Sequence, residues 1–117
     1  MLFMCQGRPR PNISLDDRQR ALKLYGAWQP PPGITIRGHY LGAHGGDFVI
    51  LETDSIEALI EATGAWAPFI EYQVTPIVEA QAGVPMLARA EQACAKLLEE
   101  VAPRSFADVA AKDRVLA

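Results

Sequence analysis

Two segments of the chain combine aliphatic residues with side chains that can exchange protons. Ile34–Leu41 contains His39, and Ile70–Val78 contains Glu71. An imidazole and a carboxylate can act as base and acid when burial and pairing tune their pKa values toward neutrality. We therefore take His39 and Glu71 as candidate catalytic residues. The residues expected to bind a ligand beside them are Arg37, Gln73, Leu41 and Glu52.

The alternation of side chains along a strand predicts which of these residues share a face. In each strand, alternate residues form one mixed, largely polar set and one largely aliphatic set. We expect the mixed sets to lie on the open side of a sheet and the aliphatic sets to pack against helices. The expected mixed set is Arg37, His39, Leu41, Glu71, Gln73 and Thr75, with Gln6 and Glu52 beside it. The expected helix-facing set is Ile34, Ile36, Tyr40, Ile70, Tyr72 and Val74.

In a second interpretation, the same polar face has no catalytic role. Polar residues on one side of an antiparallel sheet commonly form a solvated or interface surface, on which Arg37 and Glu71 would simply pair. His44 lies in a glycine-rich segment between two strands, where we expect it to be exposed and without a role.

The sequence predicts no cofactor and no metal site. Its two histidines lack the further ligands that a metal centre needs. The loop Gly42–Gly46 has no G-x-G-x-x-G pattern and precedes a strand, which argues against phosphate binding. We interpret the large aromatic residues as core or dimer contacts rather than as a ligand cage; they are Trp28, Trp66 and Phe69.

Hydrophobic periodicity predicts four strands and two helices in the first part of the chain. In order these are strand Leu2–Gln6, helix Ser14–Ala27, strands Ile34–Leu41 and Phe48–Thr53, helix Asp54–Ala65 and strand Ile70–Val78. The order βαββαβ is that of the ferredoxin-like α+β fold, with an antiparallel sheet and both helices on one face. The other face then needs a cover, which a second copy of the same sheet can supply.

Local signals set the expected boundaries of these elements. Ser14 is a good helix N-cap, and Asp54 with Glu57 three residues later forms a capping-box pattern. The residues from Gly7 to Asn12 are expected to form a connector, and Pro76 predicts an edge position or a late bulge in the last strand.

The C-terminal part of the chain is predicted to be helical. Pro85 is expected to open a helix with an apolar stripe from Leu87 to Val101, Pro103 to end it, and Ser105 to begin a short last helix. We therefore divide the chain into an α+β domain, residues 1–80, and a helical extension, residues 81–117.

Composition excludes several classes of protein. With 117 residues, of which 50% are apolar, the chain has the size and composition of a single globular domain. Its net charge of −3 argues against the basic surface that nucleic-acid binders carry. No apolar run is long enough for a membrane span, and the start lacks the basic region of a signal peptide. From these features we expect a cytoplasmic location, and we expect Cys5 and Cys94 to be thiols in the core.

Several of these motifs together resemble a known bacterial family. They are the opening Met1–Met4, Pro31-Pro32-Gly33 before an aliphatic strand, the glycine-rich hairpin, and Ile70–Ile77. The chain resembles an uncharacterised domain-of-unknown-function family placed among the dimeric α/β-barrel proteins, over about residues 1–80. The resemblance implies a homodimer whose sheets face each other around a barrel-like space, and it implies no activity.

Two classes of function remain open at this point. The first is a small homodimeric protein that binds an apolar or aromatic molecule between its sheets or serves as an accessory subunit. The second is a cofactor-independent enzyme of the monooxygenase, isomerase or cyclase type, with His39 and Glu71 transferring protons. The sequence does not name the ligand or substrate.

Overall fold

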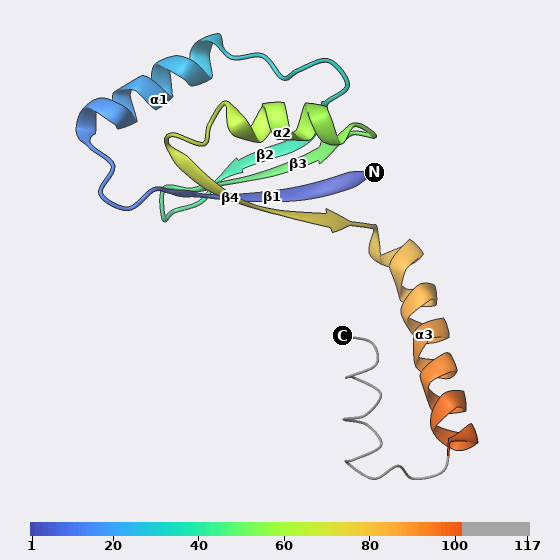
Figure 1. Cartoon of the computed structure of the whole chain (residues 1–117). Helices are drawn as coiled ribbons and strands as arrows, with labels where there is room; N and C mark the ends of the chain where they lie inside the picture. Colours follow the sequence, from blue (N-terminus) through green and yellow to red (C-terminus); the bar gives the residue numbers. More distant parts are fainter. Residues whose placement is uncertain (102–117) are drawn as a thin grey trace, which may run out of the picture. The chain divides into compact units, whose positions relative to one another are not determined.

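The structure, a computed structural model, describes residues 1–101 and divides the chain into two units after Val78 (Figure 1). The first unit, Met1–Val78, holds six elements, and the described part of the second holds one helix. The elements are β1 (Leu2–Pro9), α1 (Leu15–Ala27), β2 (Thr35–Leu41), β3 (Asp47–Glu52), α2 (Ile56–Gly64), β4 (Ile70–Ile77) and α3 (Ala80–Glu100).

The first unit has the predicted ferredoxin-like α+β fold. Its four antiparallel strands lie in the order β2-β3-β1-β4, and Figure 1 shows α1 and α2 on the same side of the sheet. Because β4 lies at the edge, Pro76 costs the sheet little, as predicted. The strand β1 is longer than predicted, since it continues through Gly7 to Pro9, which pairs with Ile70. The predicted connector therefore begins three residues too early.

A bulge in β2 changes which side chains share a face. The register shifts between Ile36 and Gly38, so that Ile36 lies opposite Leu51 and His39 lies opposite Val49. An extra residue in one strand reverses the facing of everything after it. The predicted faces of three β2 residues are therefore wrong, because the alternation was assumed to be unbroken. His39 and Leu41 lie on the helix side of the sheet, and Tyr40 lies on the open side.

The core of the first unit lies between the sheet and α2. Its buried apolar residues are Phe3, Cys5, Leu51, Ala58, Leu59, Ala62 and Trp66. None of them comes from α1, although the apolar residues of that helix recur at helical spacing. The helix α2 therefore supplies the helical part of the core, whereas α1 lies over the sheet without a buried residue.

The start of α1 agrees with the sequence prediction, whereas the starts of α2 and α3 differ from it. Ser14 caps α1 by accepting a hydrogen bond from the Asp17 backbone nitrogen at 3.1 Å, as predicted. At α2 the N-cap is Ser55 rather than Asp54, because its hydroxyl accepts from the Ala58 nitrogen. The helix α3 begins at Ala80 and includes Pro85, so the predicted start at Pro85 is wrong. The predicted short helix from Ser105 lies outside the described residues.

The uneven packing of the two helices leads to a prediction about stability. Leu59→Ala removes a buried core side chain and should lower the free energy of unfolding by about 3 kcal/mol. Leu22→Ala on α1 is the matched control, and because Leu22 is 74% exposed it should cost less than about 1 kcal/mol. Urea unfolding followed by circular dichroism measures both, and equal losses would show that α1 packs as tightly as α2.

Candidate functional site

A large cavity lies within the first unit, between the sheet and the helices. Its volume is about 1230 Å³, and it opens to solvent beside α1. The walls are mainly aliphatic and aromatic; among them are Ile13, Leu22, Tyr25, Trp28, Ile34, Ile36, Leu41, Val49, Leu51, Trp66, Phe69 and Ile70. The space exists because α1 is not packed onto the strands beneath it.

Aromatic side chains form one wall of this cavity. Tyr25 of α1 lies with its ring centre 6.4 Å from Trp66, and Trp28 makes an edge-to-face contact with Trp66 at 5.7 Å. The Tyr25 ring also lies 5.8 Å from the imidazole of His39. Trp66 is buried as predicted, but it also lines the cavity with Trp28 and Phe69, a role that the sequence analysis did not assign.

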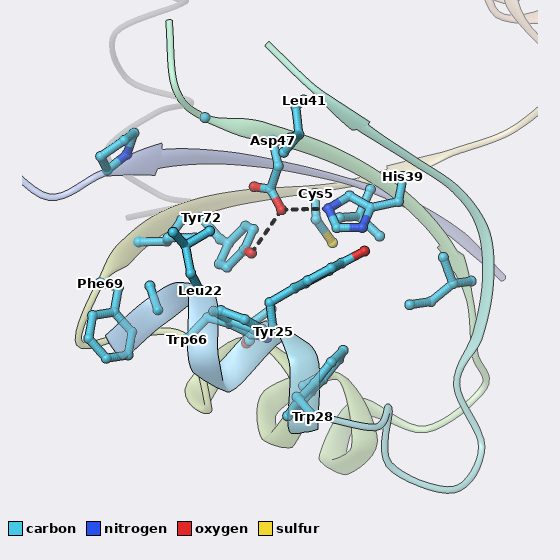
Figure 2. Close-up of a pocket in the computed structure, with 18 of the residues that line it drawn as sticks. Cys5, Leu22, Tyr25, Trp28, His39, Leu41, Asp47, Trp66, Phe69 and Tyr72 are labelled. Carbon is cyan, nitrogen blue, oxygen red and sulfur yellow. Dashed lines mark hydrogen bonds and ion pairs between the residues drawn. The ribbon is translucent and has the colours of Figure 1, made fainter. Parts of the chain in front are cut away.

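A cluster of three polar side chains lies at one end of the cavity (Figure 2). The Asp47 Oδ2 atom is 3.1 Å from His39 Nε2 and accepts a hydrogen bond from the Tyr72 hydroxyl at 3.2 Å. A carboxylate can only accept, so the His39 proton lies on Nε2 in this arrangement. The cluster thus consists of one buried acceptor between two donors.

Three strands bring this cluster together. Asp47 begins β3 opposite Leu41 and Gly7, Tyr72 of β4 also lies opposite Gly7, and the bulge turns His39 toward them. Glycine is required between the strands because a Cβ atom on Gly7 would overlap Asp47 Oδ1 and lie 2.8 Å from Tyr72 Cε1. The missing side chain of Gly7 therefore provides the room for the carboxylate and the phenol.

The electrostatics of the cluster follow from burial. The Asp47 residue is 7% exposed, and its Oδ1 atom has no hydrogen-bond partner among the described residues. Burial, the charge of Asp47 and the hydrogen bond to it raise the pKa of Tyr72 well above its usual value. Burial and the Asp47 charge also raise the pKa of the Cys5 thiol. Tyr72 therefore keeps its proton and remains a donor, and Cys5 remains a neutral thiol in the cavity wall.

The structure brings together only some of the residues expected to form a site. His39 and Leu41 line the cavity, whereas Glu71 and Gln73 lie on the open face of the sheet. Glu71 receives a hydrogen bond from Arg10 at 3.2 Å, and Arg37 bonds to Glu52 through Nε at 2.8 Å. The expected Arg37–Glu71 pair is therefore wrong, and His39 and Glu71 do not meet.

Two members of the cluster were not expected as site residues. Tyr72 was assigned to the correct face but treated as an apolar residue, although its hydroxyl needs a partner when buried. Asp47 was placed in the loop before the strand. A single acidic residue after Gly46 carries no periodic signal, so only the strand register shows that it faces the cavity.

No group of histidine, cysteine, aspartate or glutamate side chains within residues 1–101 is arranged to hold a metal ion. Over the same range, none of the helices combines the length and apolar character needed to cross a membrane.

The fold and the cavity together define the class of this molecule: a small α+β protein of ferredoxin-like topology with a solvent-open cavity between its sheet and its helices. The chain belongs to the family described as domain of unknown function DUF3303, which matches residues 1–91. The match extends past the predicted limit near residue 80 and includes the first half of α3. No curated protein and no solved structure matches the chain.

The raised pKa of Tyr72 predicts how stability depends on pH. An unfolded tyrosine ionises near pH 10, whereas the folded protein keeps this proton, so the stabilisation is present below about pH 10 and is lost as the pH rises further. Tyr72→Phe should remove this loss, so the free energy of unfolding falls less steeply above about pH 10. At neutral pH the variant should be about 1–2 kcal/mol less stable, because Asp47 loses a donor.

Urea unfolding at neutral and alkaline pH tests this expectation. The matched control is Tyr40→Phe, since Tyr40 is 63% exposed, and the stability of this variant at neutral pH should equal that of the wild type. An equal alkaline slope in Tyr72→Phe and the wild type would contradict the prediction.

Proposed function

We propose that the protein binds a small aromatic or apolar molecule in the cavity between its sheet and its helices. The sequence analysis expected such a ligand between the sheets of two copies; the cavity instead suggests a site within one copy. The observation that supports the proposal most directly is the cavity of about 1230 Å³, which has apolar walls and one polar end. Small-molecule sites commonly have this composition, with volumes of about 300–1,000 Å³.

The exposure of α1 supports the same proposal. Leu22 and Tyr25 line the cavity, yet they are 74% and 60% exposed, so the apolar side of this helix lacks a partner in the described structure. Burying a leucine-sized side chain is worth about 2 kcal/mol. A ligand in the cavity would cover these residues and give α1 the packing that the sheet does not supply.

The two tryptophans provide the test, because both line the cavity. The probe is 8-anilinonaphthalene-1-sulfonate, whose emission rises in apolar surroundings and is excited by energy transfer from tryptophan. Ala21→Phe adds a ring to the cavity wall and should weaken dye binding about tenfold, which corresponds to 1.4 kcal/mol. Lys23→Phe is the matched control, because Lys23 lies on α1 outside the cavity lining, and it should bind like the wild type.

Three results decide the outcome. Weakened binding in Ala21→Phe alone supports the proposal. Equal affinity in both variants would place the dye elsewhere, and an absence of energy transfer in the wild type would contradict binding in the cavity.

We also propose that two copies associate through the open face of the sheet. Half-buried apolar side chains gather there, on the side of the sheet opposite α1 and α2 (Figure 1); they are Leu2, Met4, Phe48, Ile50 and Ile77. The face also carries both signs of charge, since Arg37 and Arg8 lie there with Glu52 and Glu71. A surface with apolar residues and balanced charge is complementary to itself, which is what a twofold interface requires.

The described part of the second unit offers another apolar surface. The helix α3 has no buried residue, and Val84, Leu87, Leu97 and Leu98 are exposed. We propose that this side of α3 adds contacts between the two copies. Cys5 is buried as expected, but Cys94 is exposed, so its expected place as a core thiol is wrong. Both thiols are free, which fits the cytoplasmic location that we expect.

Ile50→Lys tests the proposed interface. Ile50 lies near the middle of the open face, opposite Met4 on β1 and Gly38 on β2, so a charge there should separate the copies without disturbing the core. Sedimentation velocity at micromolar concentration should show a dimer for the wild type and a monomer for this variant. Ile60→Lys, at an exposed position of α2, is the matched control and should remain a dimer. A monomeric wild type would refute the interface.

A further inference from the structure

We propose that the polar end of the cavity transfers a proton, with His39 acting as a general base on an aromatic keto acid. The inference rests on the proposed binding of an aromatic molecule and adds the reaction and the class of substrate to it. The sequence-based pair of His39 and Glu71 is replaced by a cluster in which His39 contacts Asp47.

The orientation of His39 is the first reason. Its Nε2 atom is held 3.1 Å from Asp47, so the proton of the neutral ring lies there and Nδ1 remains an acceptor. Side-chain exposure is 29% for His39 and 10% for Asp47, so the imidazole is the member of the pair that a ligand can reach. Figure 2 shows the imidazole between Asp47 and the phenolic end of Tyr25, facing the cavity. A base oriented by a carboxylate is a recurring arrangement in proton transfer.

The surroundings of Asp47 are the second reason. Tyr72 donates to the same Oδ2 atom, and the absence of a side chain at Gly7 lets the carboxylate sit close to the strand. Asp47 and Tyr72 are therefore positioning residues.

The remaining lining indicates the class of substrate. Tyr25, Trp28 and Trp66 supply surfaces for an aromatic ring. Arg18 of α1 also lines the cavity and is exposed, so its guanidinium provides a cation for a carboxylate. An aromatic keto acid carries both groups, and the carbon between its ring and its carbonyl is acidic enough for an imidazole base.

The reaction needs neither an oxidant nor a cofactor. His39 Nδ1 takes a proton from the carbon beside the carbonyl, the C–H electron pair becomes a C=C bond, and the carbonyl π pair moves to oxygen. The imidazolium then returns the proton to the oxygen, which gives the enol, or to the carbon, which restores the ketone. In D2O the imidazolium N–H exchanges with the solvent before reprotonation, so the second route replaces hydrogen by deuterium at that carbon.

Deuterium exchange of phenylpyruvate, followed by proton NMR, tests the proposal. The wild type should accelerate exchange at the benzylic carbon, and His39→Gln should lose about 100-fold of that acceleration while still quenching tryptophan fluorescence on binding. Glu71→Gln is the matched control; it changes the other expected catalytic residue, on the opposite face, and should exchange like the wild type. Thermal unfolding of each variant checks that it folds.

Asp47→Asn separates a positioning role from a merely structural one. The amide no longer fixes the imidazole proton on Nε2, so the exchange rate at saturating phenylpyruvate should fall while the half-saturating concentration stays as in the wild type. A raised half-saturating concentration with an unchanged saturated rate would overturn the assigned role of Asp47.

The outcomes distinguish the two proposals. Phenylpyruvate that quenches fluorescence but exchanges no faster than without protein overturns the proton transfer and leaves the binding function in place. Exchange that persists in His39→Gln, or is lost in Glu71→Gln, overturns the assignment to His39. The absence of quenching by phenylpyruvate together with the absence of dye binding overturns both.

Discussion

The buried carboxylate of Asp47 is the constraint on which the arrangement of the sheet depends. Removing a charged carboxylate from water costs several kcal/mol unless hydrogen bonds replace the lost solvent. Here the donors come from β2 and β4, on either side of the strands that carry Asp47 and Gly7. His39 can donate only because the bulge turns it to the helix side, and the carboxylate fits only because Gly7 has no side chain. The bulge in β2 and the glycine in β1 are therefore both needed to form this cluster.

The second feature that shapes the molecule is the unequal role of its two helices. The helix α2 contributes Ala58, Leu59 and Ala62 to the core, whereas α1 buries nothing. The Ser14 cap and the acidic residues of the first turn stabilise α1 at its N-terminal end, while packing contributes little to this helix. A helix that is formed but not docked leaves space beneath it, and that space is the cavity. The helix α2 thus supplies the helical part of the core, whereas α1 contributes only to the cavity, which Ala62 and Thr63 of α2 also line.

The fold could be predicted from the sequence, but the site could be predicted only in part. Hydrophobic periodicity located all six elements of the first unit and their order, because burial imposes that pattern over many residues. The face of His39 could not be predicted, since a single extra residue at Arg37 reverses the alternation and leaves no mark in composition. Asp47 was missed for a related reason: its significance comes from strand pairing with Gly7, a contact between distant parts of the chain.

Similar pairs of charged side chains on the two faces of the sheet differ in their exposure to water. On the open face, Glu52 and Glu71 pair with arginines, and every partner is more than 40% exposed. Water screens such pairs, and each is worth less than about 1 kcal/mol. On the helix face, Asp47 and His39 form a similar contact with far less water around the carboxylate. An electrostatic interaction strengthens as the local dielectric falls, so the same pairing that is weak around Glu71 can orient the imidazole beside Asp47. Burial, more than residue type, is therefore what separates a candidate proton-transfer group from a surface ion pair in this sheet.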